Sequence, residues 1–513
     1  MIDKTLDNRI PRRLELAAAL TLLALGFALR LAGLGTLPFG LNQDEASAGY
    51  DAWAILTSGM DRCGNRLPVL LESWGSGQNA LLSYLALPFI AVLGLSALSI
   101  RLPMALAGCA ALAVFWRYAR RTRGPAFGLT ALLFLAVCPW SILASRWALE
   151  SNLLPPLLMA GVFFTARARE KPWSLLTAAV CYGLSPYAYG TAFFFLPPFL
   201  LFAVLWLGKR LRPAPFCVSL AVFSALVLPI SLCQLRNALG LPAAAFLGFT
   251  LPALTEGRQL ATSVLGGGGP AAAWVNLRTL GRILLTQSDG MIYNSLGLRN
   301  GGVIWCFGLP LAALGLWKSL SSLRRAPLEA PMLAAFCIAA ASAALIDGNI
   351  NRLNMLWLPL CYFAALGLYV LFGLLKKWSA LPIAGLLVCL VLFLAAYRGQ
   401  LGGAGNANYF PGLGQCIAYV EAREPGAAYI TDYVNQPYIF ALFYTETPAE
   451  DFVDSVDYVN PDGAFRQVRS FGHWRFGSAE DAAGDYLILN AAEAGGRAAL
   501  VQYGDYVVCP GSG

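Results

Sequence analysis

Two adjacent carboxylates, Asp44 and Glu45, stand just after the first long apolar run of the chain, Leu16 to Leu34. A carboxylate near a membrane surface can act as a general base and take a proton from an acceptor hydroxyl. The same pair also suits the first turn of a helix, where acidic side chains cap N–H groups and oppose the helix dipole. From these two residues alone, a catalytic base and a helix cap are equally open.

Three arginines stand beside later apolar runs and could bind a phosphate: Arg101, Arg146 and Arg352. An arginine at membrane depth is costly and is usually paired or functional, and its planar fork matches phosphate oxygens. Each also has a structural explanation. Arg146 could pair with Glu150 one helical turn later, and Arg101 and Arg352 could be anchors that reach the membrane surface. Because all are expected on the face that carries the acidic pair, we favour substrate binding by the three arginines and Glu150.

The composition shows what must position these residues. The chain has 513 residues, of which 58% are hydrophobic and 12% charged, with a mean hydropathy of +0.61. Such a chain is an integral membrane protein. Its net charge of +8 lies in short clusters between apolar runs, which indicates membrane topology and no nucleic-acid partner. With one histidine, His473, no metal site is predicted, although a divalent cofactor stays open. Cys416 and Cys509 are the only plausible disulfide partners.

We predict an all-α polytopic membrane domain with about eleven spans. The expected spans are 14–34, 99–118, 126–144, 150–166, 173–188, 191–208, 215–234, 302–320, 331–347, 353–374 and 379–397. The apolar segment 78–95 is expected to be re-entrant or interfacial, broken near Pro88, because six basic clusters then all face the cytoplasm. These clusters lie near residues 4–13, 117–123, 167–171, 209–212, 318–325 and 376–377. The N-terminus is then cytoplasmic and the C-terminus lies outside a bacterial plasma membrane.

Two domains are predicted: a membrane domain over 1–397, with a first outer loop at 35–98, and a small α/β extracytoplasmic domain over 398–513. The loop should begin with an amphipathic helix on the membrane, with Asp44 and Glu45 at its start. In the tail, strands are expected at 427–430, 486–489 and 506–508, and helices at 413–422 and 437–444. The long segment 236–301 is expected to be an outer loop.

A carboxylate base, a cationic clamp and apolar surroundings suit transfer of a group from a polyprenyl-phosphate carrier, with the lipid phosphate as leaving group. The four glycines 266–269 lack a preceding strand and a following Gly-Lys-Ser/Thr, so a nucleotide loop is not expected. A transporter or flippase of lipid-linked sugars is the main alternative, although ionisable residues within the spans are scarce. A second alternative is an assembly protein without catalytic activity.

Several motifs make the chain similar to a known family. They are Asp44-Glu45 with Tyr50 and Ala52, Gly59-x-Asp61-x-x-Gly64 with Leu67-Pro68, Gly94-Leu-Ser96-x-x-Ser99-x-Arg101-Leu-Pro103, Pro139-Trp140 through Ser145-Arg146-x-x-x-Glu150, and Asn351-Arg352. They resemble the GT-C glycosyltransferases that use polyprenyl-phosphate sugars, specifically the group of protein O-mannosyltransferases and aminoarabinose-lipid A transferases (glycosyltransferase family 39-like). The first 150 residues match best, and Asp289-Gly290 and Tyr293-Asn294 match more loosely.

The resemblance implies an inverting glycosyltransferase, hexosyl or pentosyl, with Asp44 as the base and Glu45 supporting it. It places the arginine that precedes Leu-Pro at Arg101, and we assign Tyr50 and Asp61, which stand in the same motifs, to substrate binding. The implied partners are a polyprenyl-phosphate sugar donor, a protein or an envelope glycan or lipid as acceptor, and membrane lipids. One motif departs from the family: its usual His or Lys before the next helix is replaced by Gly77-Gln78-Asn79.

Overall fold

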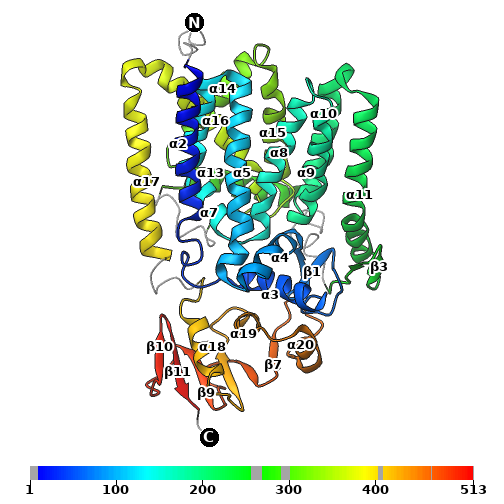
Figure 1. The fold of residues 1–513 in the computed structure, drawn as a ribbon, viewed down its shortest axis with the longest axis vertical. Coiled ribbons are helices and arrows are strands. Elements are labelled where there is room, and N and C mark those ends of the chain that lie inside the picture. The colour runs from blue at the N-terminus through cyan, green and yellow to red at the C-terminus, as the bar shows by residue number, and fades with distance from the viewer. Residues whose placement is uncertain (1–9, 256–268, 290–300, 402–407, 464, 512–513) are drawn as a thin grey trace. The chain divides into compact units, whose positions relative to one another are not determined.

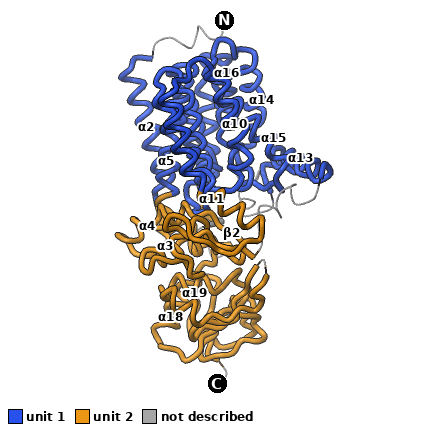
Figure 2. Tube along the Cα trace, turned by 90° about the vertical axis from the view of Figure 1, so that its right-hand side faces the viewer, with its two compact units in different colours: residues 1–32, 104–228, 259–396 blue, residues 33–103, 229–258, 397–513 orange. Residues whose placement is uncertain are grey.

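The computed structural model describes residues 10–255, 269–289, 301–401, 408–463 and 465–511. The chain forms two compact units, coloured separately in Figure 2. Unit 1 comprises residues 1–32, 104–228 and 259–396, and unit 2 comprises 33–103, 229–258 and 397–513. The first outer loop and the tail therefore share one unit. The predicted domain boundary at 397/398 remains a prediction.

Unit 1 is built from apolar helices (Figure 1). They are α2 (Arg12–Leu31), α5 (Ala97–Arg123, from Met104 on), α6 (Pro125–Val137), α7 (Pro139–Arg146), α8 (Leu154–Arg167), α9 (Ser174–Ala188), α10 (Ala192–Leu207), α11 (Pro213–Ala238, to Leu228), α13 (Gly269–Thr286), α14 (Gly308–Ser322), α15 (Ala330–Ser342), α16 (Asn354–Leu375) and α17 (Ala380–Leu401, to Ala396). Short 3-10 turns η1 (Glu150–Leu153), η2 (Gly208–Arg210), η6 (Pro327–Glu329) and η7 (Lys376–Trp378) adjoin them. Helices satisfy their own backbone groups, as a segment in lipid must.

Six of the described helices are long and apolar enough to cross a membrane, or seven if α6 and α7 form one broken span bent by 58°. A span needs about 20 residues. Four expected spans, 150–166, 173–188, 302–320 and 331–347, correspond to α8, α9, α14 and α15, which have 13–15 residues each. The protein is a multi-pass membrane protein, and the count of about eleven spans remains a prediction.

Close helix packing in unit 1 depends on two glycines. A Cβ atom on Gly315 of α14 would lie 1.8 Å from the carbonyl oxygen of Phe363, and one on Gly367 of α16 would lie 1.9 Å from that of Leu311. The two backbones therefore approach as closely as small residues allow, which is how helices gain packing energy in lipid.

Three ion pairs of unit 1 join the basic end of α5 to neighbouring elements. They are Arg120 with Glu15 at the start of α2, Arg121 with Glu170 after α8 at 2.7 Å, and Arg123 with the buried Glu329 of η6. These contacts gather the basic clusters at 117–123 and 167–171, and the turn that follows 318–325, at one end of the helices. This arrangement agrees with a common side for these clusters.

In unit 2, α3 (Gln43–Ser58) is followed by the hairpin β1 (Leu70–Ser73) and β2 (Ser76–Asn79), and by α4 (Leu81–Leu93). α3 is buried along most of its length because it packs against α4 and α19, so it is not simply a helix on a membrane surface. α4 has 13 residues, short for a span, and it continues through the exposed Pro88, where a break was expected. The predicted break was wrong: the proline removes one main-chain hydrogen bond without ending the helix.

The segment 236–301 is not one loop. It contains the hairpin β3 (Ala244–Phe246) and β4 (Phe249–Leu251) and helix α13. The glycines 266–268, Gly290, Tyr293 and Asn294 lie outside the described residues.

The tail forms the predicted α/β region. A seven-stranded sheet runs in the order β10-β11-β9-β5-β8-β7-β6, with β5 parallel to β8 and β9 and the other pairs antiparallel (Figure 1). The strands are β5 (Ala428–Thr431), β6 (Asp457–Tyr458), β7 (Val468–Phe471), β8 (Trp474–Gly477), β9 (Tyr486–Asn490), β10 (Val501–Tyr503) and β11 (Tyr506–Pro510), and the helices are α18 (Leu413–Glu421), α19 (Pro437–Thr445) and α20 (Ala449–Ser455). The five expected elements are confirmed as β5, β9, β11, α18 and α19. Cys416 and Cys509 are both buried free thiols.

Candidate active site

The acidic pair lies in the first turn of α3. Asn42 is the N-cap: its side chain accepts a hydrogen bond from the Asp44 N–H at 3.0 Å, and its own N–H donates to the Glu45 carboxylate at 3.3 Å. This reciprocal arrangement is a capping box, which satisfies two backbone donors that a helix start leaves open. Glu45 therefore has the helix-cap role that the sequence left open for the acidic pair.

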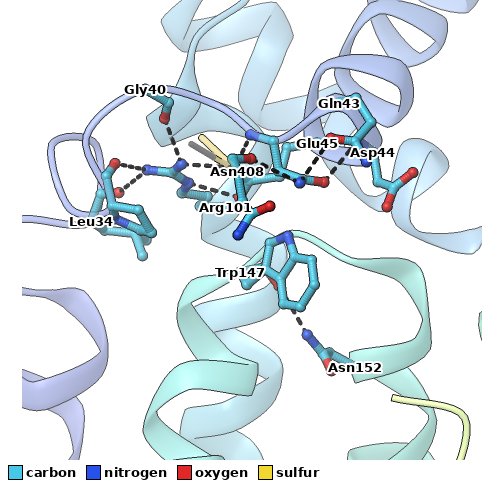
Figure 3. Close-up of polar contacts among 11 residues, drawn as sticks. Leu34, Gly40, Gln43, Asp44, Glu45, Arg101, Trp147, Asn152 and Asn408 are labelled. Carbon is cyan, nitrogen blue, oxygen red and sulfur yellow. Dashed lines mark hydrogen bonds and ion pairs between the residues drawn. The ribbon is translucent and has the colours of Figure 1, made fainter. Parts of the chain in front are cut away.

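Glu45 and Arg101 form a fully buried ion pair (Figure 3). Arg101 donates to the two Glu45 oxygens from Nε at 2.8 Å and Nη2 at 2.7 Å. Its remaining three N–H groups donate to main-chain carbonyls, those of Leu34 at 3.2 Å, Pro38 at 3.0 Å and Gly40 at 2.9 Å. All five donors of the guanidinium are occupied within the chain. This geometry favours a positioning role for Arg101 over the phosphate contact predicted from sequence.

The Asp44 carboxylate has a different environment. Asp44 is partly exposed, whereas Glu45 is completely buried. In Figure 3 the Asp44 side chain points away from the Glu45–Arg101 pair. The two neighbouring carboxylates therefore differ in environment. Glu45 turns inward to the buried Arg101, and Asp44 turns away from it.

A buried polar row continues along α3 from Asp44. Ser47 and Asp51 follow at spacings of three and seven residues, so all three side chains share one helix face. Arg62 meets this face: its Nη1 lies 2.8 Å from Ser47 Oγ and 3.1 Å from Asp51 Oδ2. Its guanidinium also lies 5.0 Å from the ring centre of Trp74. Burial raises the pKa of Asp51, and the Arg62 charge opposes that rise.

Tyr50 and Asp61, the other predicted site residues of this unit, have structural partners. The Tyr50 hydroxyl donates to the carbonyl of Thr447 at 2.7 Å, so it fastens α3 to the tail. Asp61 accepts hydrogen bonds from the N–H groups of Cys63 and Asn65, both at 2.9 Å, and so closes a tight turn. Burial, with the nearby Asp51 charge, raises the pKa of Asp61 to about 7.

The remaining predicted residues belong to unit 1. Arg146, the last residue of α7, donates from Nη1 to the carbonyls of Leu29, Arg30 and Ala32 at 2.8–3.2 Å. These carbonyls end α2 and have no partner inside that helix. Arg352 pairs with the exposed Asp347 at 2.7 Å. Glu150 begins η1, whose Ser151 and Asn152 accept hydrogen bonds from Asn354.

Sequence reasoning missed two buried arginines. Arg62 is not among the residues selected from the sequence, yet it is the centre of the α3 row. Arg30 lies inside the first span, where its guanidinium binds the carbonyls of Leu135 and Ala136 and the Ser141 hydroxyl. A charge inside an apolar run was the available signal for Arg30. Among the described residues, no three His, Cys, Asp or Glu side chains gather as a metal site.

Comparisons with known proteins agree with the motifs. A sequence model of the family described as dolichyl-phosphate-mannose-protein mannosyltransferase matches residues 80–232. None of the curated proteins matches the chain. Among solved structures, ArnT from Cupriavidus metallidurans bound to undecaprenyl phosphate is similar over 96% of this chain and 97% of that one, with 13% identity and a TM-score of 0.54. The Archaeoglobus fulgidus oligosaccharyltransferase in complex with Zn and sulfate is similar over 92% of this chain and 68% of that one, with 12% identity and a TM-score of 0.52.

These similarities confirm the predicted resemblance. The chain has the fold of the GT-C membrane glycosyltransferases. The extent of the ArnT match covers the tail as well as the helices, so the fold likeness applies to nearly the whole chain.

Proposed function

We propose that this protein is an inverting glycosyltransferase that moves a sugar from a polyprenyl-phosphate carrier to an acceptor hydroxyl on the outer face of a bacterial plasma membrane. The fold it shares with ArnT, whose structure contains undecaprenyl phosphate, supports such a donor. The ion pairs that gather basic clusters at one end of the unit 1 helices support a cytoplasmic side for that end.

The observation that carries the proposal is the separation of the two carboxylates. Glu45 is committed to Arg101 and the helix cap, whereas Asp44 is partly exposed and turned away from that pair. At a helix N-terminus a carboxylate is favoured in its ionised form, which is the form a base needs. Asp44 is therefore assigned as the general base and Glu45 as a positioning residue that holds the start of α3.

In the proposed reaction, Asp44 takes the proton of the acceptor hydroxyl as its oxygen attacks the anomeric carbon of the sugar. The bond from that carbon to the phosphate oxygen breaks, and the electron pair leaves with the lipid phosphate. A single displacement from the opposite side inverts the anomeric configuration. The acceptor, a protein or an envelope glycan or lipid, and the sugar, hexose or pentose, stay open in this proposal.

For the lipid phosphate, the best of the three predicted arginines is Arg352. Its described partner, Asp347, is a largely exposed carboxylate, and exposed ion pairs hold weakly enough to exchange for a phosphate. Arg101 has no donor left, and Nη1 of Arg146 is occupied by the end of α2. Glu150, Tyr50 and Asp61 keep their predicted substrate-binding roles only as proposals, and a divalent metal requirement is open.

The test measures sugar transfer by purified protein from a panel of polyprenyl-phosphate hexoses and pentoses, with mass spectrometry of envelope acceptor fractions. Wild-type protein should transfer at least one sugar. Asp44→Asn should fold, bind donor and lose about 10²–10⁴-fold in turnover, which is the usual cost of a missing general base. Asp454→Asn, an exposed tail carboxylate, is the matched control and should be fully active. Near-normal turnover of Asp44→Asn would move the search for the base to Glu150 or Asp289.

A further inference from the structure

Gln78 of β2 is a buried amide beside the polar row of α3. Its side chain is 5% exposed, and its Oε1 lies 2.9 Å from the Ser47 hydroxyl. β2 pairs with β1 in the antiparallel hairpin, with Gln78 opposite Leu71, so the strand position of Gln78 is fixed by its ladder.

The hydrogen-bond directions around Ser47 determine how the Gln78 amide is turned. Arg62 has only donors, so Ser47 Oγ must accept from its Nη1 at 2.8 Å. The single Ser47 proton is then available for Gln78, which must present its carbonyl oxygen. The Gln78 Nε2 group, with two N–H donors, consequently points away from Ser47.

Among the described residues, the one hydrogen bond of the Gln78 side chain is that with Ser47, so its nitrogen has no acceptor from the protein. This nitrogen is not one of the fully buried side-chain atoms without a partner, so it reaches accessible space. An amide nitrogen that reaches accessible space and has no acceptor from the protein can donate to a ligand. The row Asp51–Arg62–Ser47–Gln78 thus ends in a positioned pair of N–H groups with nothing of the protein to bind.

Ser47 lies one helical turn after Asp44 on the same face of α3, which brings the Gln78 amide near the proposed base. We propose that Gln78 binds a hydroxyl oxygen of the donor sugar and contributes to sugar specificity; this inference rests on the proposed function. The amide is neutral and adjoins a row that already contains two carboxylates, Asp44 and Asp51. Asp51 and Arg62 compensate each other's charge within this row. The amide itself is neutral, and a neutral hydroxyl oxygen suits it as a partner.

The test compares binding of two probes, bare undecaprenyl phosphate and an undecaprenyl-phosphate sugar. The sugar is the one that wild-type protein transfers, or the one it binds most tightly if no transfer is seen. Gln78→Glu keeps an oxygen for Ser47 but removes both N–H groups, and Gln78→Met removes all polarity. Each variant should weaken binding of the sugar-bearing lipid about 3–10-fold, the range expected for one lost hydrogen bond, and leave the bare lipid unchanged. Gln502→Glu on the exposed strand β10 is the matched control.

A donor that lacks one sugar hydroxyl adds a second arm. Removal of the hydroxyl that Gln78 binds should weaken wild-type binding by the same factor and have no further effect in Gln78→Met. Unchanged sugar-lipid binding in both folded variants would overturn the inference, and so would an equal loss for the bare lipid, which would assign Gln78 to the phosphate. If wild-type protein transfers no sugar but Gln78 variants still bind the sugar-lipid selectively worse, the proposed function fails while the Gln78 site stands.

Discussion

Arg146 donates a hydrogen bond to the main-chain oxygen of Arg30 at 3.2 Å. The side chain of each arginine binds carbonyls at the end of another helix. Arg146 comes from the end of α7 and binds the last carbonyls of α2. Arg30 comes from α2 and binds Leu135 and Ala136 at the end of α6, as well as Ser141 of α7. The break between α6 and α7 therefore depends on α2, and the end of α2 depends on α7.

This reciprocal capping predicts coupled stabilities. Arg146→Met and Arg30→Met should each lower the free energy of unfolding by about 1.5–3 kcal/mol or more, because buried carbonyls lose charge-assisted bonds. The double variant should lose clearly less than the sum, since either change frees the same helix junction. Denaturant unfolding in detergent measures all three, with the exposed Arg324→Met as control. Simple additivity would show that the two caps act independently.

The Glu45–Arg101 pair predicts a stability effect where sequence alone predicted a binding effect. Arg101→Ala leaves a buried carboxylate without its cation, which typically costs about 3–5 kcal/mol. Glu45→Gln should also destabilise the protein, and its turnover should fall less than that of Asp44→Asn. Unfolding curves of both variants, together with the donor affinity of the folded protein, distinguish a stabilising role from a phosphate-binding role. If Arg101→Ala is as stable as wild type but binds bare polyprenyl phosphate poorly, the phosphate role predicted from sequence is correct.

The sequence predicted the start of α3 and the five main tail elements because each has a strong local signal. Asn42 followed by two acids and an apolar run specifies a helix start, and residues 486–489 form a compact apolar run. Local signals of this kind could not predict which residues the site residues contact. Glu45 and Arg101 are 56 residues apart, and a residue type that binds phosphate binds a carboxylate equally well.

The β1–β2 hairpin shows a second limit. Its turn is Trp74-Gly75, in which Trp74 has a positive φ of 56°, a conformation rare for a bulky residue. Tertiary contacts hold it there, among them the Tyr438 ring, edge-to-face with a centroid distance of 6.0 Å, and the Arg62 guanidinium. Local sequence cannot reveal a turn that depends on the tail, and so the position of Gln78 after it was not predicted.

The predicted sidedness can be tested by cysteine labelling in cells. Ser321 lies at the basic end of unit 1 and Ser455 lies on α20, and both are exposed. In a background without other exposed cysteines, Ser321→Cys should resist an impermeant outside reagent and Ser455→Cys should react. Permeabilised cells, in which both positions should react, are the control. Outside labelling at 321 would contradict the proposed topology.

Asp61 predicts a pH dependence of stability. Its pKa of about 7 in the folded protein exceeds its ordinary value of 3.8, because it is buried near Asp51. The folded state therefore holds a proton that the unfolded chain releases, and stability from this group falls as pH rises from about 4 to about 7. Asp61→Asn keeps the acceptor for Cys63 and Asn65 but cannot titrate. Its unfolding free energy should decline less over this interval than that of wild type.

The comparison is made from unfolding midpoints at pH 4.5, 5.5, 6.5 and 7.5 in one detergent. Asp454→Asn, which removes an exposed carboxylate, should keep the wild-type pH dependence. Asp51→Asn supplies an internal check: without the Asp51 charge, Asp61 should titrate at lower pH, so the decline should end earlier on the pH scale. Identical pH profiles for wild type and Asp61→Asn would show that Asp61 is already ionised in the folded protein across this interval.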